Sequence, residues 1–355
     1  MSPPFRADQV GSLLRPPELT QARSHRSADL KEVQQQAIRA AVAKQEAIGL
    51  EAVTDGEFSR DWWHLDFLSQ LDGVTLRENP GPGFGGTGEQ PPIPGVTGKL
   101  RYSRPVMVDD FAFLKSVTRK TAKFTIPSPS MLHLRAGRAG ISRQVYPDIA
   151  EFWSDAAQAY RAAIAAFAAA GCTYLQLDDV AFAYLCDPKI RDNCRNNGDD
   201  PDELPRTYAD TINRALEGRP KGMAITMHTC RGNFKSAWVA EGGYDPVAEA
   251  MFSTDVDGFF MEFDSARAGG FEPLRFLPKD KKVVLGLVSS KTARLEDKKE
   301  IAGRIQEAAK FVPLDNLCLS PQCGFSSTHH GNHLTPDEQW RKLGRVVEIA
   351  REVWR

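Results

Sequence analysis

The sequence predicts a single-domain α/β fold, a (β/α)8 barrel of the TIM type, and two patterns lead to this prediction. Short runs rich in β-branched and apolar residues alternate along the chain with longer segments whose apolar residues recur at helical spacing. These runs number eight, as do the strands of a closed parallel barrel. A doubly wound open sheet would give a similar one-dimensional pattern, and we favour the barrel.

The expected strands are short and are spread over the whole chain of 355 residues. They are residues 8–12, 52–57, 123–127, 173–178, 224–230, 258–263, 282–288 and 317–321. The longer helical segments are residues 29–48, 149–170, 204–216, 292–311 and 336–354, and Thr335 and Pro336 open the last of them. One barrel accounts for residues 1–355, since barrels commonly exceed the usual domain size.

A segment rich in glycine and proline, residues 79–98, interrupts this alternation. It reads NPGPGFGGTGEQPPIPGVTG, a composition that predicts neither regular helix nor regular strand. A loop of this length in a compact domain is usually an active-site cover or a disordered segment, and the sequence leaves both open. Its glycines follow neither of the common phosphate-binding patterns, so a phosphate loop is disfavoured.

The charge balance argues against nucleic acid or an anionic membrane as the main partner. Forty-five lysines and arginines face 46 aspartates and glutamates, for a net charge of -1. The N-terminus lacks the features of a signal peptide, and no uninterrupted apolar run reaches membrane-spanning length. We therefore expect a soluble cytoplasmic protein, with its oligomeric state open and a homo-oligomer compatible. The six cysteines are too sparse for a disulfide framework, so most should be reduced.

The first candidate site is the pair His228 and Cys230 in AITMHTCRGN, at the end of an expected strand. Side chains two apart on a strand point to the same face, so both can reach one ion. Alone, the pair is more simply explained as a buried cysteine beside a hydrogen-bonded histidine. Glu262 ends the next expected strand in DGFFMEFD, and Cys323 follows the last strand in LCLSPQCGF. Each could singly be a salt-bridge partner or a small core residue.

Strand ends converge at one mouth of a barrel, so these four residues should meet there. One nitrogen, one oxygen and two sulfurs in fourfold coordination suit zinc, since thiolates disfavour magnesium and calcium. Two thiolates and a carboxylate bring three negative charges to a divalent ion, which makes it a poor Lewis acid for carbonyl groups. Such an ion can still deprotonate an incoming thiol and leave its sulfur electron-rich. The expected chemistry is alkyl transfer to sulfur.

The same segments carry a family resemblance. The sequences VGSLLRP, VTDGEFSR, LQLDD, HTCRGNF, FMEFD, LGLVSSK and SPQCGFSST occur in this order almost from end to end. The chain resembles the cobalamin-independent methionine synthases, particularly their short single-barrel members. The resemblance implies a (β/α)8 barrel, zinc held by His228, Cys230, Glu262 and Cys323, and a homocysteine-like thiol as nucleophile.

The resemblance also implies that Ser12, Glu57 and Asp178 hold the amino and carboxylate ends of homocysteine. Glu57 and Asp178 end expected strands at the same mouth, where carboxylates can pair with an ammonium group. Asp179 should point the opposite way and be structural.

Two departures from the larger enzymes leave the methyl donor open between a folate and a corrinoid. The larger enzymes add an N-terminal barrel that helps to bind polyglutamylated folate, for which this chain has no room. They also carry a histidine after the seventh strand, where this sequence has Lys291. Lys291 is therefore one candidate acid for the leaving group.

His329, His330 and His333 form a histidine cluster after Cys323 and offer a second candidate acid, because imidazole titrates near neutrality. A solvated polar loop is the simpler explanation of the cluster. The aromatic run 62–64 could form a wall for the donor or could be core packing.

Three alternatives to homocysteine methylation remain. Related barrels alkylate other thiols, and the ligand set does not separate these reactions. A metal-free lyase resembling uroporphyrinogen decarboxylase has a similar barrel but would not need the histidine, glutamate and cysteines at three strand ends. A non-catalytic protein with structural zinc would normally lack the Glu57 and Asp178 carboxylates at the mouth.

Overall fold

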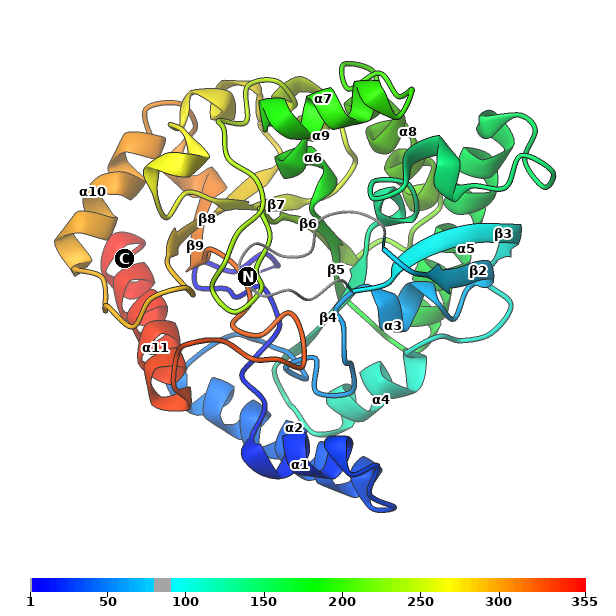
Figure 1. Ribbon diagram of the computed structural model, residues 1–355. Coiled ribbons are helices and arrows are strands. Elements are labelled where there is room, and N and C mark those ends of the chain that lie inside the picture. Colours follow the sequence, from blue (N-terminus) through cyan, green and yellow to red (C-terminus); the bar gives the residue numbers. More distant parts are fainter. Residues whose placement is uncertain (1, 80–90) are drawn as a thin grey trace.

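The computed structural model describes residues 2–79 and 91–355, and its centre is a curled sheet of seven parallel strands surrounded by helices (Figure 1). The strand order is β1-β4-β5-β6-β7-β8-β9. Their bounds are β1 Ala52–Val53, β4 Thr121–Pro127, β5 Tyr174–Asp179, β6 Ala224–Thr229, β7 Gly258–Glu262, β8 Lys282–Val288 and β9 Leu317–Pro321. This curled parallel sheet with helices around it confirms the predicted fold class.

An N-terminal segment fills the place between the first and last strands. The Asp8 N–H donates to the Leu319 carbonyl of β9 at 3.0 Å, and the Leu13 N–H donates to the Gly56 carbonyl beyond β1 at 3.0 Å. The prediction of a regular strand at residues 8–12 is wrong, because only Ala7 makes a β-bridge there. Backbone carbonyls after Ala7 accept hydrogen bonds from side chains instead. For example, Gln176 Nε2 donates to the Val10 carbonyl at 2.9 Å.

A two-stranded antiparallel hairpin, β2 (Asp72–Arg77) and β3 (Ile93–Arg101), lies outside the barrel (Figure 1). The prediction that residues 79–98 contain no regular strand is therefore wrong for residues 93–98, while residues 80–90 lie outside the described residues. A two-stranded ribbon tolerates proline at positions whose N–H faces outward, which admits Pro94. At Gly73, with φ +80°, a Cβ would approach the Gly98 carbonyl to 2.6 Å, so glycine is needed where the strands come closest.

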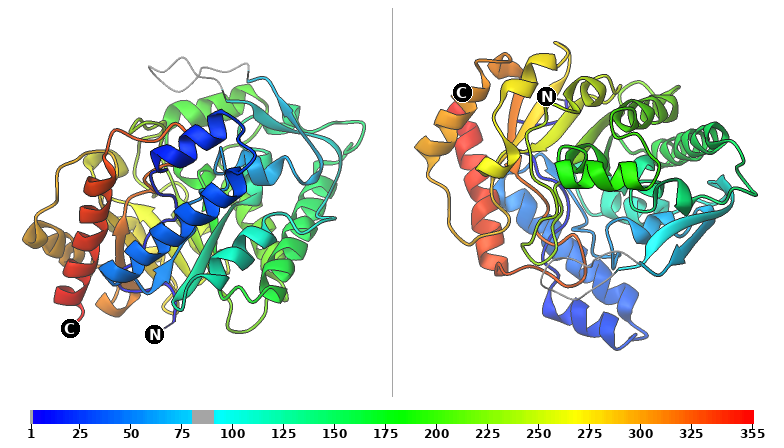
Figure 2. Two further views of the ribbon diagram at one scale, coloured as in Figure 1. Left: turned by 90° about the horizontal axis from the view of Figure 1, so that it is seen from below. Right: turned by 45° about the horizontal axis from the view of Figure 1, so that its top comes forward.

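The helices pack around the outside of the sheet, and α2 packs against both α1 and α11 (Figure 2). Their bounds are α1 Pro17–Ser24, α2 Leu30–Ile48, α3 Leu65–Leu68, α4 Val108–Ser116, α5 Ile149–Ala169, α6 Ala181–Tyr184, α7 Pro188–Asn196, α8 Leu204–Leu216, α9 Ala248–Phe252, α10 Lys298–Ala308 and α11 Pro336–Val353. Short 3-10 turns occur at Pro129–Leu132, Gly137–Gly140, Ala266–Ala268, Glu272–Phe276 and Leu314–Asn316.

Capping explains where two of the helices begin. Helix α10 begins at Lys298 and not at residue 292 as expected, because the Asp297 side chain accepts from the N–H groups of Lys299 and Glu300 at 2.9 and 3.1 Å. Helix α11 begins as predicted, with Thr335 and Glu338 forming a reciprocal capping box. None of the described helices is long and apolar enough to cross a membrane.

Candidate metal centre and active site

Three of the four candidate metal ligands come together at the carboxyl ends of the strands. His228 lies on β6, Cys230 directly follows β6, and Cys323 lies two residues beyond β9. The two sulfurs are 3.3 Å apart, and one ligand atom from each of the three residues lies within 4.8 Å of the others. All three side chains are buried, so a cation there would be shielded from water.

The His228 ring is oriented by its neighbour on β5. The strand register pairs Asp178 with His228, and the two side chains approach to 3.2 Å between Oδ1 and Nδ1. Burial acts to lower the pKa of His228, but the Asp178 carboxylate and the nearby Cys323 sulfur raise it to about 10. Nε2 has no hydrogen-bond partner among the described residues, which is unusual for a buried nitrogen. In metal-binding histidines, one ring nitrogen usually binds a carboxylate and the other is free to hold the metal.

The two cysteine sulfurs shift each other's pKa in opposite directions. Their mutual hydrogen bond raises the pKa of Cys230, with burial acting in the same direction, while it lowers the pKa of Cys323, assisted by His228. Imidazole nitrogen and two closely spaced sulfurs form a donor set that soft or borderline divalent metals prefer. The residues present therefore fit a metal centre.

Glu262 stands beside this group, and its carboxylate accepts from Cys230 as well as from residues outside the group. Its Oε1 lies 3.7 Å from the Cys230 sulfur and accepts from Gln322 Nε2 at 2.9 Å, and its Oε2 is 3.3 Å from Arg267. Glu262 is fully buried, and burial raises its pKa, opposed mainly by Lys291. It is thus near the three ligands without belonging to the compact group that they form.

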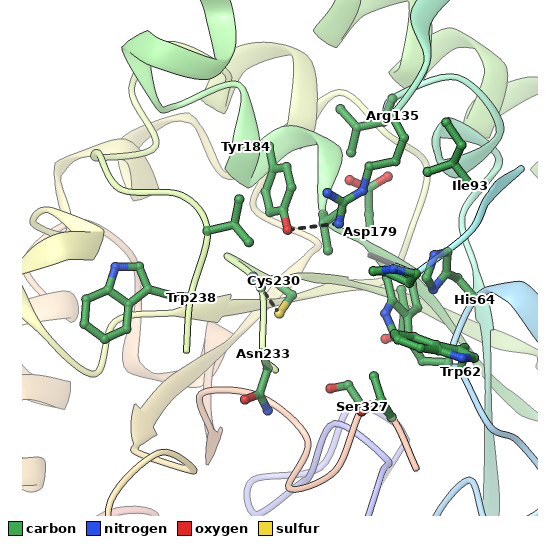
Figure 3. A pocket seen from close by; sticks show the side chains of 18 of the residues that line it. Trp62, His64, Ile93, Arg135, Asp179, Tyr184, Cys230, Asn233, Trp238 and Ser327 are labelled. Atoms are coloured by element: carbon green, nitrogen blue, oxygen red, sulfur yellow. Dashed lines mark hydrogen bonds between the residues drawn. The ribbon is translucent and has the colours of Figure 1, made fainter. Parts of the chain in front are cut away.

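A cavity of about 630 Å³ opens over the three ligands, and Ser12, Glu57 and Asp178 line it with them (Figure 3). Glu57 follows Gly56 in a sharp turn in which both residues have positive φ. Its Oε1 accepts from Thr125 at 3.1 Å, while its Oε2 has no partner among the described residues. Burial raises the pKa of Glu57 to about 7; Arg60 opposes this shift and Asp178 adds to it.

Asp178 and Asp179 have different surroundings, as expected from their alternating directions on β5. Asp178 accepts from Gln176 at 2.7 Å and faces His228. Asp179 accepts from the Ser128 and Ser130 hydroxyls and from the Phe182 N–H. It therefore ties the turns after β4 and β5 together.

Ser12 links the N-terminal segment to the segment that carries Cys323. Its hydroxyl oxygen accepts from the Ser326 N–H at 3.3 Å, which leaves its O–H free to donate into the cavity. A Cβ on Gly324 would collide with the Ser12 side chain, so this close approach needs a glycine next to the candidate ligand Cys323.

Comparisons with known proteins agree with this site. A model of the catalytic domain of cobalamin-independent synthases matches residues 15–352. The chain belongs to the cobalamin-independent methionine synthase family. Its predicted family membership is confirmed, and the chain is an enzyme of the methyltransferase type.

Several members of this family differ in how far they are characterised. The uncharacterised Bacillus subtilis protein YxjH is 48% identical over 362 residues, covering 99% of this chain and 95% of that protein. A Listeria monocytogenes structure, provisionally named a vitamin-B12-independent methionine synthase, is 38% identical with a TM-score of 0.80 and covers 100% of this chain and 99% of that one. The Bacillus licheniformis 5-methyltetrahydropteroyltriglutamate–homocysteine methyltransferase is 23% identical over 87% of this chain but only 36% of its own length.

Lys291, which stands where larger members of the family are expected to carry a histidine, holds the loop that follows Cys230. Its ammonium donates to the carbonyls of Gly232 and Ala237 at 3.1 and 3.4 Å and to Asn233 Oδ1 at 3.3 Å. It is not among the described residues that line the cavity. Its position suits holding this loop better than giving a proton to a donor.

The histidine cluster does not line the cavity among the described residues. His329 and His333 are exposed, and the half-buried His330 packs against Trp62 and Phe234 with ring centroids 5.4 and 5.0 Å apart. None of the three histidines is among the described lining residues, whereas Trp62, Trp63 and His64 are. Of these two groups, therefore, the aromatic run and not the histidine cluster lines the cavity.

Arg135 and Tyr184 are among the lining residues that sequence reasoning missed (Figure 3). Arg135 lies in the irregular segment after β4, and Tyr184 ends the short helix α6. Neither belongs to a motif or to an expected strand end. The one available signal was that both segments follow the carboxyl end of a strand, where a barrel has its active-site loops.

Proposed function

We propose that the protein is a zinc-dependent methyltransferase that moves a methyl group from a folate or corrinoid donor to the thiol of homocysteine, forming methionine. The observation that carries this proposal is the pairing of a buried imidazole and two sulfurs, within 4.8 Å of one another, with the Glu57 and Asp178 carboxylates in one cavity. His228, Cys230 and Cys323 would hold the metal, and Glu262 would complete the set by turning its carboxylate from Gln322.

The metal, when bound, lowers the pKa of an incoming thiol and keeps its sulfur nucleophilic. The protein's own residues then fix the amino acid. Glu57 Oε2 can accept from the substrate ammonium, and the Ser12 O–H can donate to its carboxylate. Asp178 keeps the His228 ring in place and adds negative charge opposite the ammonium.

The outer part of the cavity is where the methyl donor would lie. The indole of Trp62, which lines the cavity, lies nearly parallel to the Phe234 ring, with centroids 6.4 Å apart and an interplanar angle of 12°, and gives the cavity a flat aromatic wall. A planar donor held against this wall can present its methyl group to the sulfur for an in-line displacement. Transfer to a different thiol remains the alternative, since the zinc ligands would be the same.

The metal-free lyase alternative is less well supported. A metal-free lyase would not need two cysteines and a histidine with an unpartnered Nε2 buried together. A buried unsatisfied nitrogen costs on the order of 1–3 kcal/mol, so a fold that keeps one usually uses it.

Metal content and thiol alkylation together test the proposed function. We expect about one zinc per chain in protein purified without added metal, and methionine formation from homocysteine and methyltetrahydrofolate or methylcobalamin. Cys323→Ser should lose both, while Cys318→Ser, a buried cysteine on β9 far from the ligand group, should keep the metal. On cobalt-substituted protein, homocysteine should shift the thiolate-to-cobalt absorption. Full activity of metal-free wild type would refute the proposal.

A further inference from the structure

We propose that Arg135 forms an anion-binding subsite in the outer part of the active-site cavity, where it holds a carboxylate or phosphate group of the methyl donor. The inference rests on the proposed methyltransferase function, because it assigns a chemical feature to the donor of that reaction. It makes Arg135 a specificity-determining residue of the site.

The charge of the cavity is divided between its two ends. Glu57 and Asp178 lie beside the metal ligands, where they suit an ammonium group. A third lining carboxylate, Asp179, is occupied by the hydroxyls of Ser128 and Ser130 and makes no ion pair with Arg135. Arg135 is the one lysine or arginine among the described lining residues. A cation at a distance from two carboxylates favours a ligand whose opposite end is negatively charged, and it disfavours a neutral one.

Arg135 is not already neutralised by the protein. No carboxylate of the described residues lies within ion-pair distance of its guanidinium, and its one hydrogen bond is to the Tyr184 hydroxyl at 3.4 Å (Figure 3). It also packs over the Tyr184 ring, 5.3 Å from the centroid, which fixes the direction of the side chain. Guanidinium carries five N–H donors in a rigid fork that matches carboxylate and phosphate oxygens, so most of its donors remain available.

His64 gives the neighbouring wall a neutral polar edge. It is 6% exposed, lines the same cavity, and its Nδ1 has no hydrogen-bond partner among the described residues. Burial, assisted by the charge of Arg135, lowers the pKa of His64 to about 3, so the imidazole is uncharged at neutral pH. It can therefore hydrogen-bond to a ligand without adding a second cation. Trp63 packs on it with centroids 4.6 Å apart, which suits an aromatic donor that ends in an anion.

Steady-state kinetics with a charged donor and its neutral counterpart test the subsite. We use 5-methyltetrahydrofolate and its glutamate diamide, in which both carboxylates are replaced by carboxamides. Arg135→Met should raise the KM for the charged donor on the order of 10- to 100-fold, the loss expected for one charge-assisted contact, with little change in kcat. The KM for the diamide should be the same in wild type and variant. Arg135→Lys should restore part of the affinity.

Arg143→Met is the matched control, because Arg143 lies eight residues away, is exposed and does not line the cavity. It should behave as wild type with both donors. Metal content and thermal unfolding of Arg135→Met should equal those of wild type. An equal rise in KM for the charged donor and the diamide, or no rise for either, would overturn the proposal.

A binding measurement separates failure of the subsite from failure of the proposed function. Trp62, Trp63 and Trp238 line the cavity, so ligand binding should change tryptophan fluorescence. We titrate p-aminobenzoylglutamate against its diamide, and phenyl phosphate against phenol. If p-aminobenzoylglutamate binds more tightly to wild type than to Arg135→Met, the subsite takes a carboxylate. If phenyl phosphate does so, the subsite takes a phosphate. Either result holds even if wild type methylates no homocysteine. If neither anion binds more tightly to wild type than to Arg135→Met, there is no anion subsite.

Discussion

At the scale of single residues, the surroundings of Glu57 prepare it for a cation. Its backbone has φ +60°, which few residues other than glycine adopt, so the turn after Gly56 holds its side chain in one direction. One carboxylate oxygen is bonded to Thr125 and the other has no partner among the described residues. Burial raises its pKa to about 7. A bound ammonium group would satisfy the free oxygen and favour the ionised form.

Replacing this carboxylate tests its role in the proposed reaction. Glu57→Gln keeps the shape and removes the charge, so we expect the KM for homocysteine to rise roughly 10- to 100-fold, the value of one charge-assisted hydrogen bond. Zinc content by elemental analysis should not change. Glu51→Gln, an exposed carboxylate near the same strand, is the control and should leave the KM unchanged. An unaltered KM in Glu57→Gln would remove this residue from the binding site.

The raised pKa of Glu57 also predicts a pH dependence. Below about pH 7 the free enzyme holds Glu57 protonated and neutral, so it attracts the homocysteine ammonium less. We therefore expect kcat/KM for homocysteine to fall as the pH drops through 7, mainly through KM. The fall should be absent or strongly reduced in Glu57→Gln, whose amide does not titrate. Parallel acid limbs in both proteins would assign the titration to another group.

Single residues were predictable from the sequence only where a periodic element places them. His228 and Cys230 could be paired because alternate residues of a strand share a face, and Asp178 and Asp179 could be separated for the same reason. Arg135 lies in an irregular segment, where sequence spacing carries no direction. The side-chain orientation of Glu262 depends on Gln322, which is distant in sequence, as well as on Arg267, so the pattern of its own strand could not predict it.

At the scale of elements, the segment that carries Cys323 is positioned by the N-terminal segment. The Phe325 N–H donates to the Ser12 carbonyl at 2.9 Å, and the Ser326 N–H donates to the Ser12 hydroxyl. Gly324 lies between these contacts and Cys323 and leaves no room for a side chain. The metal centre and the amino-acid site are therefore coupled through one close approach of two segments.

A single methyl group at Gly324 should disturb both sites. Gly324→Ala forces Ser12 and Cys323 apart, so we expect a lower zinc content, a higher KM for homocysteine and a loss of about 1–3 kcal/mol in the free energy of unfolding. Gly344→Ala is the matched control. Gly344 lies within α11 with open space at its Cβ position, so alanine should stabilise the protein by about 0.5–1 kcal/mol. Metal analysis, kinetics and denaturant unfolding measure the three effects. Unchanged metal content and KM in Gly324→Ala would contradict the coupling.

The central strands were predictable because they are apolar runs buried on both faces, and β8 and β9 have the predicted bounds. The N-terminal segment shows why one strand was not. It occupies a strand position, but side chains such as Gln176 and Thr54 satisfy its carbonyls in place of a ladder, and these partners are distant in sequence. The β2–β3 hairpin was missed because its glycines and prolines suit a ribbon whose strands approach closely, which composition alone does not indicate.

At the scale of the whole molecule, the parallel barrel explains why residues from distant parts of the chain form one site. Five residues of the cavity come from five different places around the barrel, four at the carboxyl ends of strands and one in the N-terminal segment that takes the place of a strand. They are Glu57, Asp178, His228, Cys323 and Ser12. All loops after parallel strands open at the same mouth, so the order of motifs in the sequence was enough to predict that they meet. What this order could not predict is the shape and charge of the outer cavity, because those depend on the segments between the strands.

The charge of that outer cavity leads to the last prediction, which concerns the methyl donor. A polyglutamate tail carries several carboxylates and needs several cations along its path for tight binding. Among the described lining residues, Arg135 is the one such cation. We therefore expect this 355-residue protein to use mono- and triglutamyl methyltetrahydrofolate with KM values within about threefold of each other. A further charge-assisted contact to the tail would instead change affinity tenfold or more. Turnover with both folates, and with methylcobalamin as a donor that has no such tail, measures the preference. A strong preference for the triglutamate would contradict this expectation and would require cations from a partner subunit or from another part of the surface.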